Sequence, residues 1–376
     1  MFLSNDAVNR VNLHSGVQAL AQGVGGIFVL IFLLQAGLSI PQALLAYAGI
    51  MVGRFIIRPA VLPIAKRVGI KPMLVAGAIA QAIPYFLLAE VQGVGWTLFV
   101  VIGLFSLAGV VYWNAYNAYF SAIGDAEHRG HQLGVREALV AAAGVVGPIL
   151  GALALLAAGP RWTFALVGLV ELAAVLPLLG LPNIPVPPSA PGILKLARPA
   201  AIYNALDGFM DATFIYVWQI ALFVSLGESL AAYGGAMALA GLVGGGAALL
   251  LGRHIDLGFG RRMVWIVFGV GAASVVLRAA SLDHVWLAVA ASALSAVFMP
   301  LLGPVIGGSI YNMAKASPCT LRYHLATEAG WDVGGVLGCV ICAGLIAAGA
   351  PLSLAILLGL PSILVAGWWL RRLYPA

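Results

Sequence analysis

Charged residues are scarce in this sequence of 376 residues: they make up 9% of it, whereas hydrophobic residues make up 62%. Soluble domains carry roughly 25% charged residues, because a compact fold must face water over its whole surface. The low charge content excludes an ordinary soluble domain and indicates that a lipid bilayer is the solvent. The net charge of +6 does not indicate nucleic-acid binding, since the basic residues lie in short loops between apolar runs.

The sequence also lacks the motifs of ATP-driven proteins and of common hydrolases. It has no phosphate-binding P-loop, no Gly-x-Ser-x-Gly elbow and no His-Glu-x-x-His pair. Of three cysteines, Cys339 and Cys342 have C-x-x-C spacing, but they lie inside an apolar run where helix packing is the expected role. We therefore expect no enzyme, no cofactor and no bound metal, and the energy for any transport must come from a gradient.

Twelve apolar runs are long enough to cross a bilayer, which takes roughly 20 residues per helix. Lysine and arginine gather in alternate loops, which places both termini in the cytoplasm, and only Arg161 and Arg278 fall on the opposite side. The predicted fold is an all-α integral membrane protein, and its short loops favour a multi-pass protein of a bacterial inner membrane. The predicted spans are 11–37, 41–66, 72–90, 94–119, 132–159, 161–181, 196–225, 229–253, 262–280, 284–313, 321–349 and 351–370.

A proline-rich stretch divides the chain into equal numbers of spans. We predict an N-terminal six-helix bundle over 1–181, a cytoplasmic linker over 182–195 and a C-terminal six-helix bundle over 196–376. The halves also resemble each other in sequence. Residues 147–151 align with 334–338, and other short matches follow in the same order along both halves. Two parallel bundles related by a pseudo-two-fold axis along the membrane normal place a binding site between them near the midplane.

Ionisable residues inside the predicted spans form two stripes of opposite sign. Arg54 and Arg58 are four residues apart on span two, and His324, Glu328 and Asp332 recur every four residues on span eleven. The stripes overlap in depth, so we predict that they pair across the halves as a cytoplasmic gate. The alternatives are a permanent structural pair, arginines that extend toward the headgroups, or arginines that bind the cargo.

A second group of polar residues is expected to face the cavity. Asp207 and Asp211 lie one turn apart on span seven, which suits a proton or cation site, although polar helix packing is the alternative. Aromatic and amide side chains suit an organic ligand, but aromatic residues also gather at membrane interfaces. The substrate-site candidates of this kind are Gln22, Trp113, Asn114, Tyr116, Asn117 and Trp218.

Three segments resemble motifs of the major facilitator superfamily. The loop 65–71 is similar to the family's loop after span two, although Lys66 stands where an acidic residue is usual. The loop after span eight retains Asp256, Arg261 and Arg262. Span five is similar to the antiporter motif, whose need for close helix approach and a proline bend is met by Gly147, Pro148 and Gly151. The resemblance covers nearly the whole chain and implies that these six residues support conformational change.

We predict a secondary active transporter that moves a small organic solute by alternating access, through proton-coupled export by antiport. The alternative is proton-coupled uptake of an anionic or zwitterionic metabolite, and the charge of the substrate distinguishes the two. A metal-ion transporter or a non-transporting membrane protein of the same fold is a remote alternative. The expected partners are the solute, a proton or other coupling ion and the bilayer, and we expect a monomer.

Overall fold

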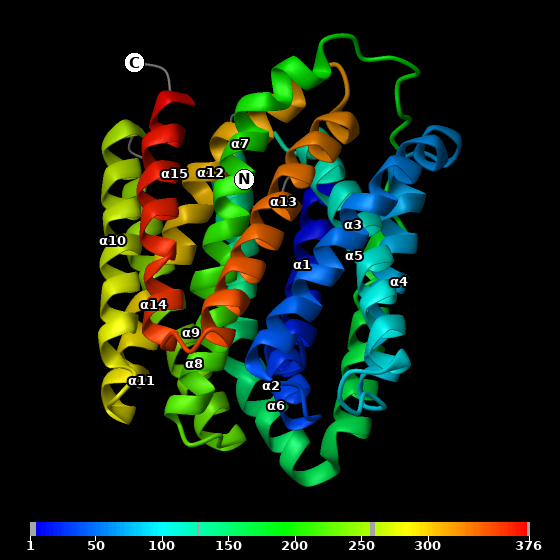
Figure 1. Cartoon of the computed structure of the whole chain (residues 1–376). Coiled ribbons are helices and arrows are strands. Elements are labelled where there is room, and N and C mark those ends of the chain that lie inside the picture. Colours follow the sequence, from blue (N-terminus) through cyan, green and yellow to red (C-terminus); the bar gives the residue numbers. More distant parts are fainter. Residues whose placement is uncertain (1–4, 126–127, 256–259, 374–376) are drawn as a thin grey trace.

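The computed structural model describes residues 5–125, 128–255 and 260–373. Every regular element within these residues is a helix. Among them, ten helices are long and apolar enough to cross a membrane. Figure 1 shows the long helices running side by side along one common direction, with the proline-rich segment crossing one end of the molecule. The prediction of an all-helical membrane protein is confirmed in this form.

The helices before the linker follow the predicted spans closely. There are two differences. The predicted span 11–37 is interrupted, since α1 ends at Val24 and is followed by η1 and α2, and in α6 Gly159 at φ 76° and ψ 174° ends one helix and lets a second begin. Both predicted spans 132–159 and 161–181 begin within α6. The elements are α1 (Asp6–Val24), η1 (Gly26–Phe28), α2 (Val29–Gln35), α3 (Ile40–Val68), α4 (Ile70–Leu88), α5 (Trp96–Ile123), α6 (Arg129–Ala173) and η2 (Leu176–Leu178).

Several helices after the linker are interrupted where an unbroken span is predicted. The predicted span 196–225 contains a π-helical stretch, and the predicted spans 284–313 and 351–370 each consist of two helices. The elements are α7 (Ile193–Asp211), η3 (Ala212–Val217, the π-helix), α8 (Trp218–Ser225), α9 (Leu230–Ile255), α10 (Gly260–Ser281), α11 (Val285–Ser295), α12 (Phe298–Ala316), α13 (Thr320–Ala347), α14 (Leu352–Leu357) and α15 (Gly359–Leu373).

Glycines let two pairs of helices approach closely, one pair on each side of the linker. A Cβ added at Gly147 of α6 would lie 2.7 Å from the Cα of Gly23 on α1. On α13, a Cβ at Gly334 would overlap the carbonyl oxygen of Ala205 on α7. Because residues 147–151 and 334–338 are the segments that the sequence repeat aligns, the repeat corresponds to the same packing device in both halves.

Local signals define α3, which carries the two arginines of the predicted gate. The helix begins at a capping box formed by Ser39 and Gln42, with a proline in its first turn. It ends at Gly69, whose φ of 90° suits glycine. Arg54 and Arg58 are both buried in the central part of this helix.

Residues of the linker join helix ends from both halves of the chain. The backbone N–H of Ile70 donates to the carbonyl oxygen of Ile184 at 2.9 Å. Arg322, near the start of α13, donates to the carbonyl oxygen of Pro188 at 2.8 Å. We call this end of the molecule, at the top of Figure 1, the linker side.

Candidate functional site

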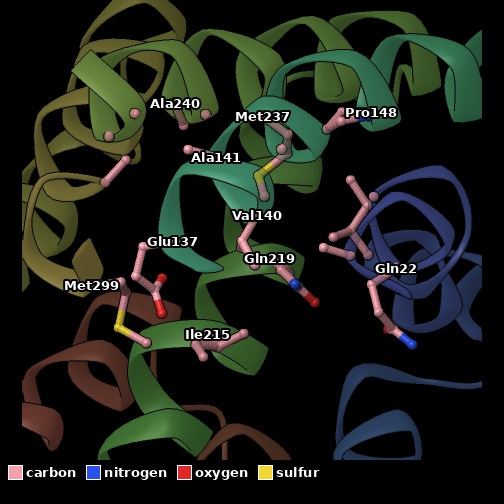
Figure 2. A pocket seen from close by; sticks show the side chains of 18 of the residues that line it. Gln22, Glu137, Val140, Ala141, Pro148, Ile215, Gln219, Met237, Ala240 and Met299 are labelled. Atoms are coloured by element: carbon pink, nitrogen blue, oxygen red, sulfur yellow. The ribbon is translucent and has the colours of Figure 1, made fainter. Parts of the chain in front are cut away.

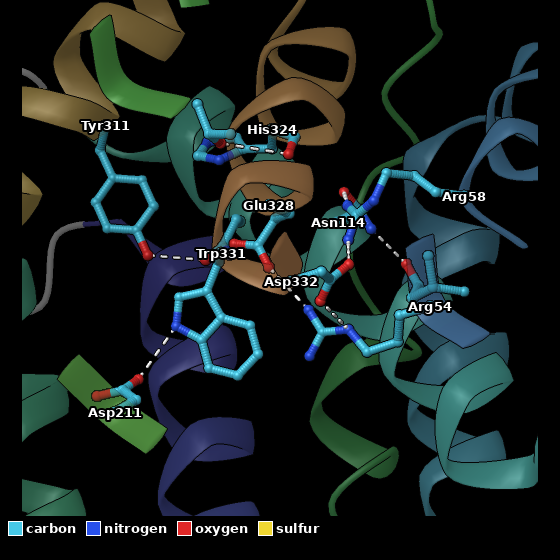
Figure 3. A network of polar contacts seen from close by, with 12 residues as sticks. Arg54, Arg58, Asn114, Asp211, Tyr311, His324, Glu328, Trp331 and Asp332 are labelled. Carbon is cyan, nitrogen blue, oxygen red and sulfur yellow. Dashed lines mark hydrogen bonds and ion pairs between the residues drawn. The ribbon is translucent and has the colours of Figure 1, made fainter. Parts of the chain in front are cut away.

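Two arginines of α3 contact two carboxylates of α13 in the interior of the molecule (Figure 3). Arg54 Nη2 lies 3.2 Å from Glu328 Oε2, and Arg54 Nε lies 2.9 Å from Asp332 Oδ1. Arg58 also pairs with Asp332, whose side chain is fully buried. We call these four residues the charge cluster. The sequence stripes predicted these contacts, whereas the role of the cluster as a gate stays a prediction.

Neutral side chains form further hydrogen bonds with the charge cluster. Arg58 donates to Asn114 Oδ1 at 2.8 Å, and Asn117 Nδ2 donates to Glu328 Oε1 at 2.9 Å. Tyr311 donates in turn to Asn117 Oδ1 at 2.8 Å. Such bonds are what make a buried ion pair tolerable, because desolvation otherwise outweighs the attraction. Asn114 and Asn117, predicted as ligand residues, therefore hold the charge cluster in this conformation.

Closer to the linker side, further contacts join α5 to α12 and α13. His324 Nε2 lies 2.8 Å from Ser121 Oγ, which connects α13 to α5. Lys315 at the end of α12 donates to the carbonyl oxygen of Gly124. Beside it, hydrogen bonds led by that from Asn5 lower the pKa of Asp125, which lies outside the membrane-spanning helices. These contacts join helices from before and after the linker on the linker side.

Asp207 and Asp211 border a polar cavity of about 440 Å³ next to the charge cluster. Trp331 Nε1 donates to Asp211 Oδ2 at 3.1 Å, and the Arg54 guanidinium lies 4.9 Å from the centre of the Trp331 ring. Neither aspartate forms an ion pair with the residues that the structure describes. Trp331, which the sequence analysis missed, therefore connects the charge cluster to Asp211. Its position three residues after Glu328 on the same helix was the available signal.

A second, mainly apolar cavity of about 530 Å³ lies among α1, α6, α9 and the π-helical region after α7 (Figure 2). Four predicted ligand residues line it: Gln22, Trp113, Tyr116 and Trp218. Pro148 of the antiporter-like segment also lines it. We call it the central cavity. Trp113 borders both cavities and therefore stands between the apolar space and the charge cluster.

A buried carboxyl group lies behind the wall of the central cavity. Gln22 Nε2 donates to Glu171 Oε1 at 3.1 Å and to the Tyr85 hydroxyl at 3.2 Å. Glu171 is 1% exposed and forms no ion pair with any described residue. Gln22 is thus held by residues of α4 and α6 and connects the cavity to a second intramembrane carboxyl.

The structure adds the burial of Arg278 to the sequence analysis, which assigned this residue to the outer side near the end of a span. Its side chain is 6% exposed and lines the central cavity. Nη1 donates to the carbonyl oxygen of Phe214 at 2.5 Å, within the π-helix. The π-helix interrupts the regular α-helical pattern between α7 and α8. The sequence carried no sign of this interruption.

The remaining motif residues fall partly within the described chain. Gly147 and Gly151 lie against α1, where a Cβ at Gly151 would meet the backbone of Val24. Asp256 lies outside the described residues, and for Arg261 and Arg262 the structure describes the backbone alone. Within the described ranges, no three His, Cys, Asp or Glu side chains are grouped so that they could hold a metal ion.

One family model matches half of the chain, and solved structures share its fold. The family model described as Major Facilitator Superfamily matches residues 15–202. The human organic anion transporter MFSD10 (TETRAN) superposes with a TM-score of 0.69 at 15% identity, over 97% of this chain and 99% of that chain. The E. coli fucose:proton symporter FucP superposes with a TM-score of 0.69 at 15% identity, over 99% of this chain and 100% of that chain. Comparison with curated proteins gives no match.

Proposed function

The chain belongs to the major facilitator superfamily and is a membrane transporter, and on this premise we propose that it is a secondary active transporter that works by alternating access. The two neighbours carry different solutes according to their names, an organic anion and fucose, so the fold alone leaves the substrate open. The proposal therefore rests on the arrangement of the two cavities and the charge cluster.

We propose twelve spans in two six-helix halves, with both termini in the cytoplasm of a bacterial inner membrane. The ten long apolar helices among the described residues support this arrangement, because they become twelve spans when the two helices of α6 are counted separately and α11 with α12 is added as one span. The linker side is then the cytoplasmic side, in line with the excess of basic residues in its loops. The close packing of α1 on α6 and of α7 on α13 is consistent with two equivalent halves.

The observation that carries the proposal is the position of the charge cluster relative to the central cavity. Glu328 and Asp332 lie roughly 12 and 18 Å along α13 from its linker-side start, at 1.5 Å per residue. The cluster joins helices from the two halves at this depth, so its contacts must break before solute can pass from the cavity to the linker side. A cluster with no net charge can separate at low cost if water reaches both faces. We therefore assign it the role of the cytoplasmic gate.

Proton coupling is assigned to the two intramembrane aspartates beside the charge cluster, which have no ion-pair partner among the described residues. Asp207 and Asp211 border the polar cavity beside the gate, and intramembrane carboxylates are the usual proton carriers of transporters. Protonation there would be sensed at the gate through Trp331, which contacts both Asp211 and Arg54. The antiporter-like segment around Gly147 and Pro148 favours export in exchange for protons.

Uptake of an anion together with protons is the second candidate. The buried Arg278 in the central cavity favours it, because this cation would attract an anionic solute. Arg54 and Arg58, which the sequence analysis considered as cargo ligands, are engaged with carboxylates in this conformation.

Transport by proteoliposomes with an enclosed pH-sensitive dye tests the proposal. Three probes of similar size and different charge serve as solutes: p-toluenesulfonate, p-toluenesulfonamide and benzyltrimethylammonium. The charged probes carry no proton through lipid themselves. Proton movement opposite to solute supports export by antiport, and movement in the same direction supports the uptake alternative. Absence of probe movement beyond that in protein-free liposomes, for all three probes, would contradict secondary transport.

A further inference from the structure

We propose that Arg278 is the anchor for the anionic group of the substrate, and that the substrate is an organic monoanion with an apolar body seated in the central cavity. This inference rests on the proposed secondary transport, adds the class of substrate to it, and favours the uptake candidate over export. It comes from the charges of the cavity wall, from the surroundings of Arg278 and from the apolar lining.

The charges that face the central cavity do not balance. Three of its lining residues are ionisable: Arg136, Glu137 and Arg278. Arg136 and Glu137 neutralise each other, since Nε and Nη2 of the arginine lie 3.0 and 2.7 Å from one glutamate oxygen. Arg278 has no carboxylate within ion-pair distance among the described residues. The cavity therefore has one uncompensated positive charge.

The guanidinium of Arg278 is held in place, but it lacks a counter-charge and part of its hydrogen bonding among the described residues. Its one hydrogen bond to a described residue goes to the carbonyl oxygen of Phe214, and its buried Nε has no hydrogen-bond partner there. The guanidinium also lies 3.9 Å from the centre of the Phe214 ring and 4.7 Å from that of Trp218. These contacts fix its orientation, but a buried cation without a counter-charge is costly in a membrane protein. A bound carboxylate or sulfonate would supply the missing counter-charge.

The rest of the wall suits an apolar body rather than a sugar or a second charge. The cavity is also lined by Ile27, Ile215, Met237 and Met299 together with small residues of α6 and α9. Figure 2 shows methionine and aliphatic side chains from several helices directed into this space. Flexible methionines adapt to ligands of different shape. The volume of about 530 Å³ lies in the range of small-molecule sites.

Ligand-induced thermal stabilisation of the purified full-length protein tests the proposal, with the same three probes. We expect p-toluenesulfonate to raise the melting temperature and the sulfonamide and the ammonium probe to have little effect. Arg278→Gln should weaken p-toluenesulfonate binding at least about tenfold, since charge-assisted hydrogen bonds contribute about 1.5–3 kcal/mol. Arg278→Lys keeps the positive charge but loses the paired N–H donors of the guanidinium, so it should bind p-toluenesulfonate with intermediate affinity. The matched control is Arg161→Gln, because Arg161 is exposed.

The outcomes separate this inference from the function on which it rests. Equal p-toluenesulfonate binding by Arg278→Gln, Arg278→Lys and the unmodified protein would overturn the anchor and leave Arg278 a structural cap of the π-helix. Stabilisation of the unmodified protein by benzyltrimethylammonium in place of the sulfonate would also overturn it, while transport of that cation would preserve the proposed function. If Arg278→Gln loses sulfonate binding but the unmodified protein transports none of the three probes, the anchor is supported and the transport function is contradicted.

Discussion

Replacing Asp332 with asparagine should open the linker side. The charge cluster contains two arginines and two carboxylates, so Asp332→Asn leaves one positive charge uncompensated at a site where the Asp332 side chain is 0% exposed. Removing one partner of a buried ion pair costs about 3–5 kcal/mol. This cost falls on the closed conformation, because water can solvate the freed arginines once the halves separate. A change of 3 kcal/mol shifts the ratio of open to closed protein more than about 100-fold.

Distances between spin labels on the linker side measure this shift. The labels are attached at Arg67→Cys and Ala316→Cys, two exposed positions in different halves, after Cys319, Cys339 and Cys342 are replaced with alanine. Pulsed electron resonance on Asp332→Asn should show a longer distance that dominates the distribution.

A charge-restoring control separates the loss of charge balance from nonspecific damage. Arg58→Gln together with Asp332→Asn restores neutrality, leaving Arg54 paired with Glu328. The double variant should regain most of the short distance that the unmodified protein shows, and Arg58→Gln alone should not. Identical distance distributions for the unmodified protein and both single variants would refute the reasoning that the cluster holds the linker side closed.

Three further predictions follow from particular contacts. Gly334→Ala should lower the free energy of unfolding by about 1–3 kcal/mol, because the added Cβ would overlap a backbone oxygen of α7. Gly344→Ala on the same helix is the control, since its Cβ would meet open space, and thermal unfolding in detergent compares the two variants. The hydrogen bond from Asn5 lowers the pKa of Asp125, so the ionised carboxylate stabilises the fold above the ordinary carboxyl pKa, and this stabilisation is lost as the pH falls through the lowered pKa. The unmodified protein should therefore be more stable to unfolding than Asp125→Asn at neutral pH but not in acid. A difference in unfolding free energy that stays constant with pH would contradict this. Asp211→Asn should keep the fold but abolish proton movement in dye-loaded proteoliposomes, and unchanged movement would exclude Asp211 as the coupling group.

The sequence predicted the helices because a membrane span needs many apolar residues, and this requirement leaves a strong signal along the chain. It also predicted the partners in the charge cluster. Ionisable residues are so costly in lipid that Arg54 and Arg58 on one span required acidic partners on another, and Glu328 and Asp332 matched them in depth. Spacing by four residues was enough to place each pair on one helix face.

Interruptions inside spans could not be predicted in the same way. The π-helix of 212–217 depends on packing that no local residue indicates, and it contains the carbonyl group to which Arg278 donates. Since Arg278 lies near the end of an apolar run, the positive-inside pattern placed it with the outer loops. Its burial and its place in the central cavity follow only from the way α10 packs beside the π-helical region.

Labelling of a cavity residue from each side of the membrane tests the central claim of alternating access most directly. Val140 lines the central cavity, so Val140→Cys can be introduced into the cysteine-free protein and exposed to a membrane-impermeant maleimide. Right-side-out and inside-out vesicles present the two sides separately. We predict labelling from both sides, with Asp332→Asn raising the rate from the linker side and lowering it from the other. Labelling from one side alone, unchanged by Asp332→Asn, would contradict alternating access and indicate a membrane protein whose cavity never changes sides.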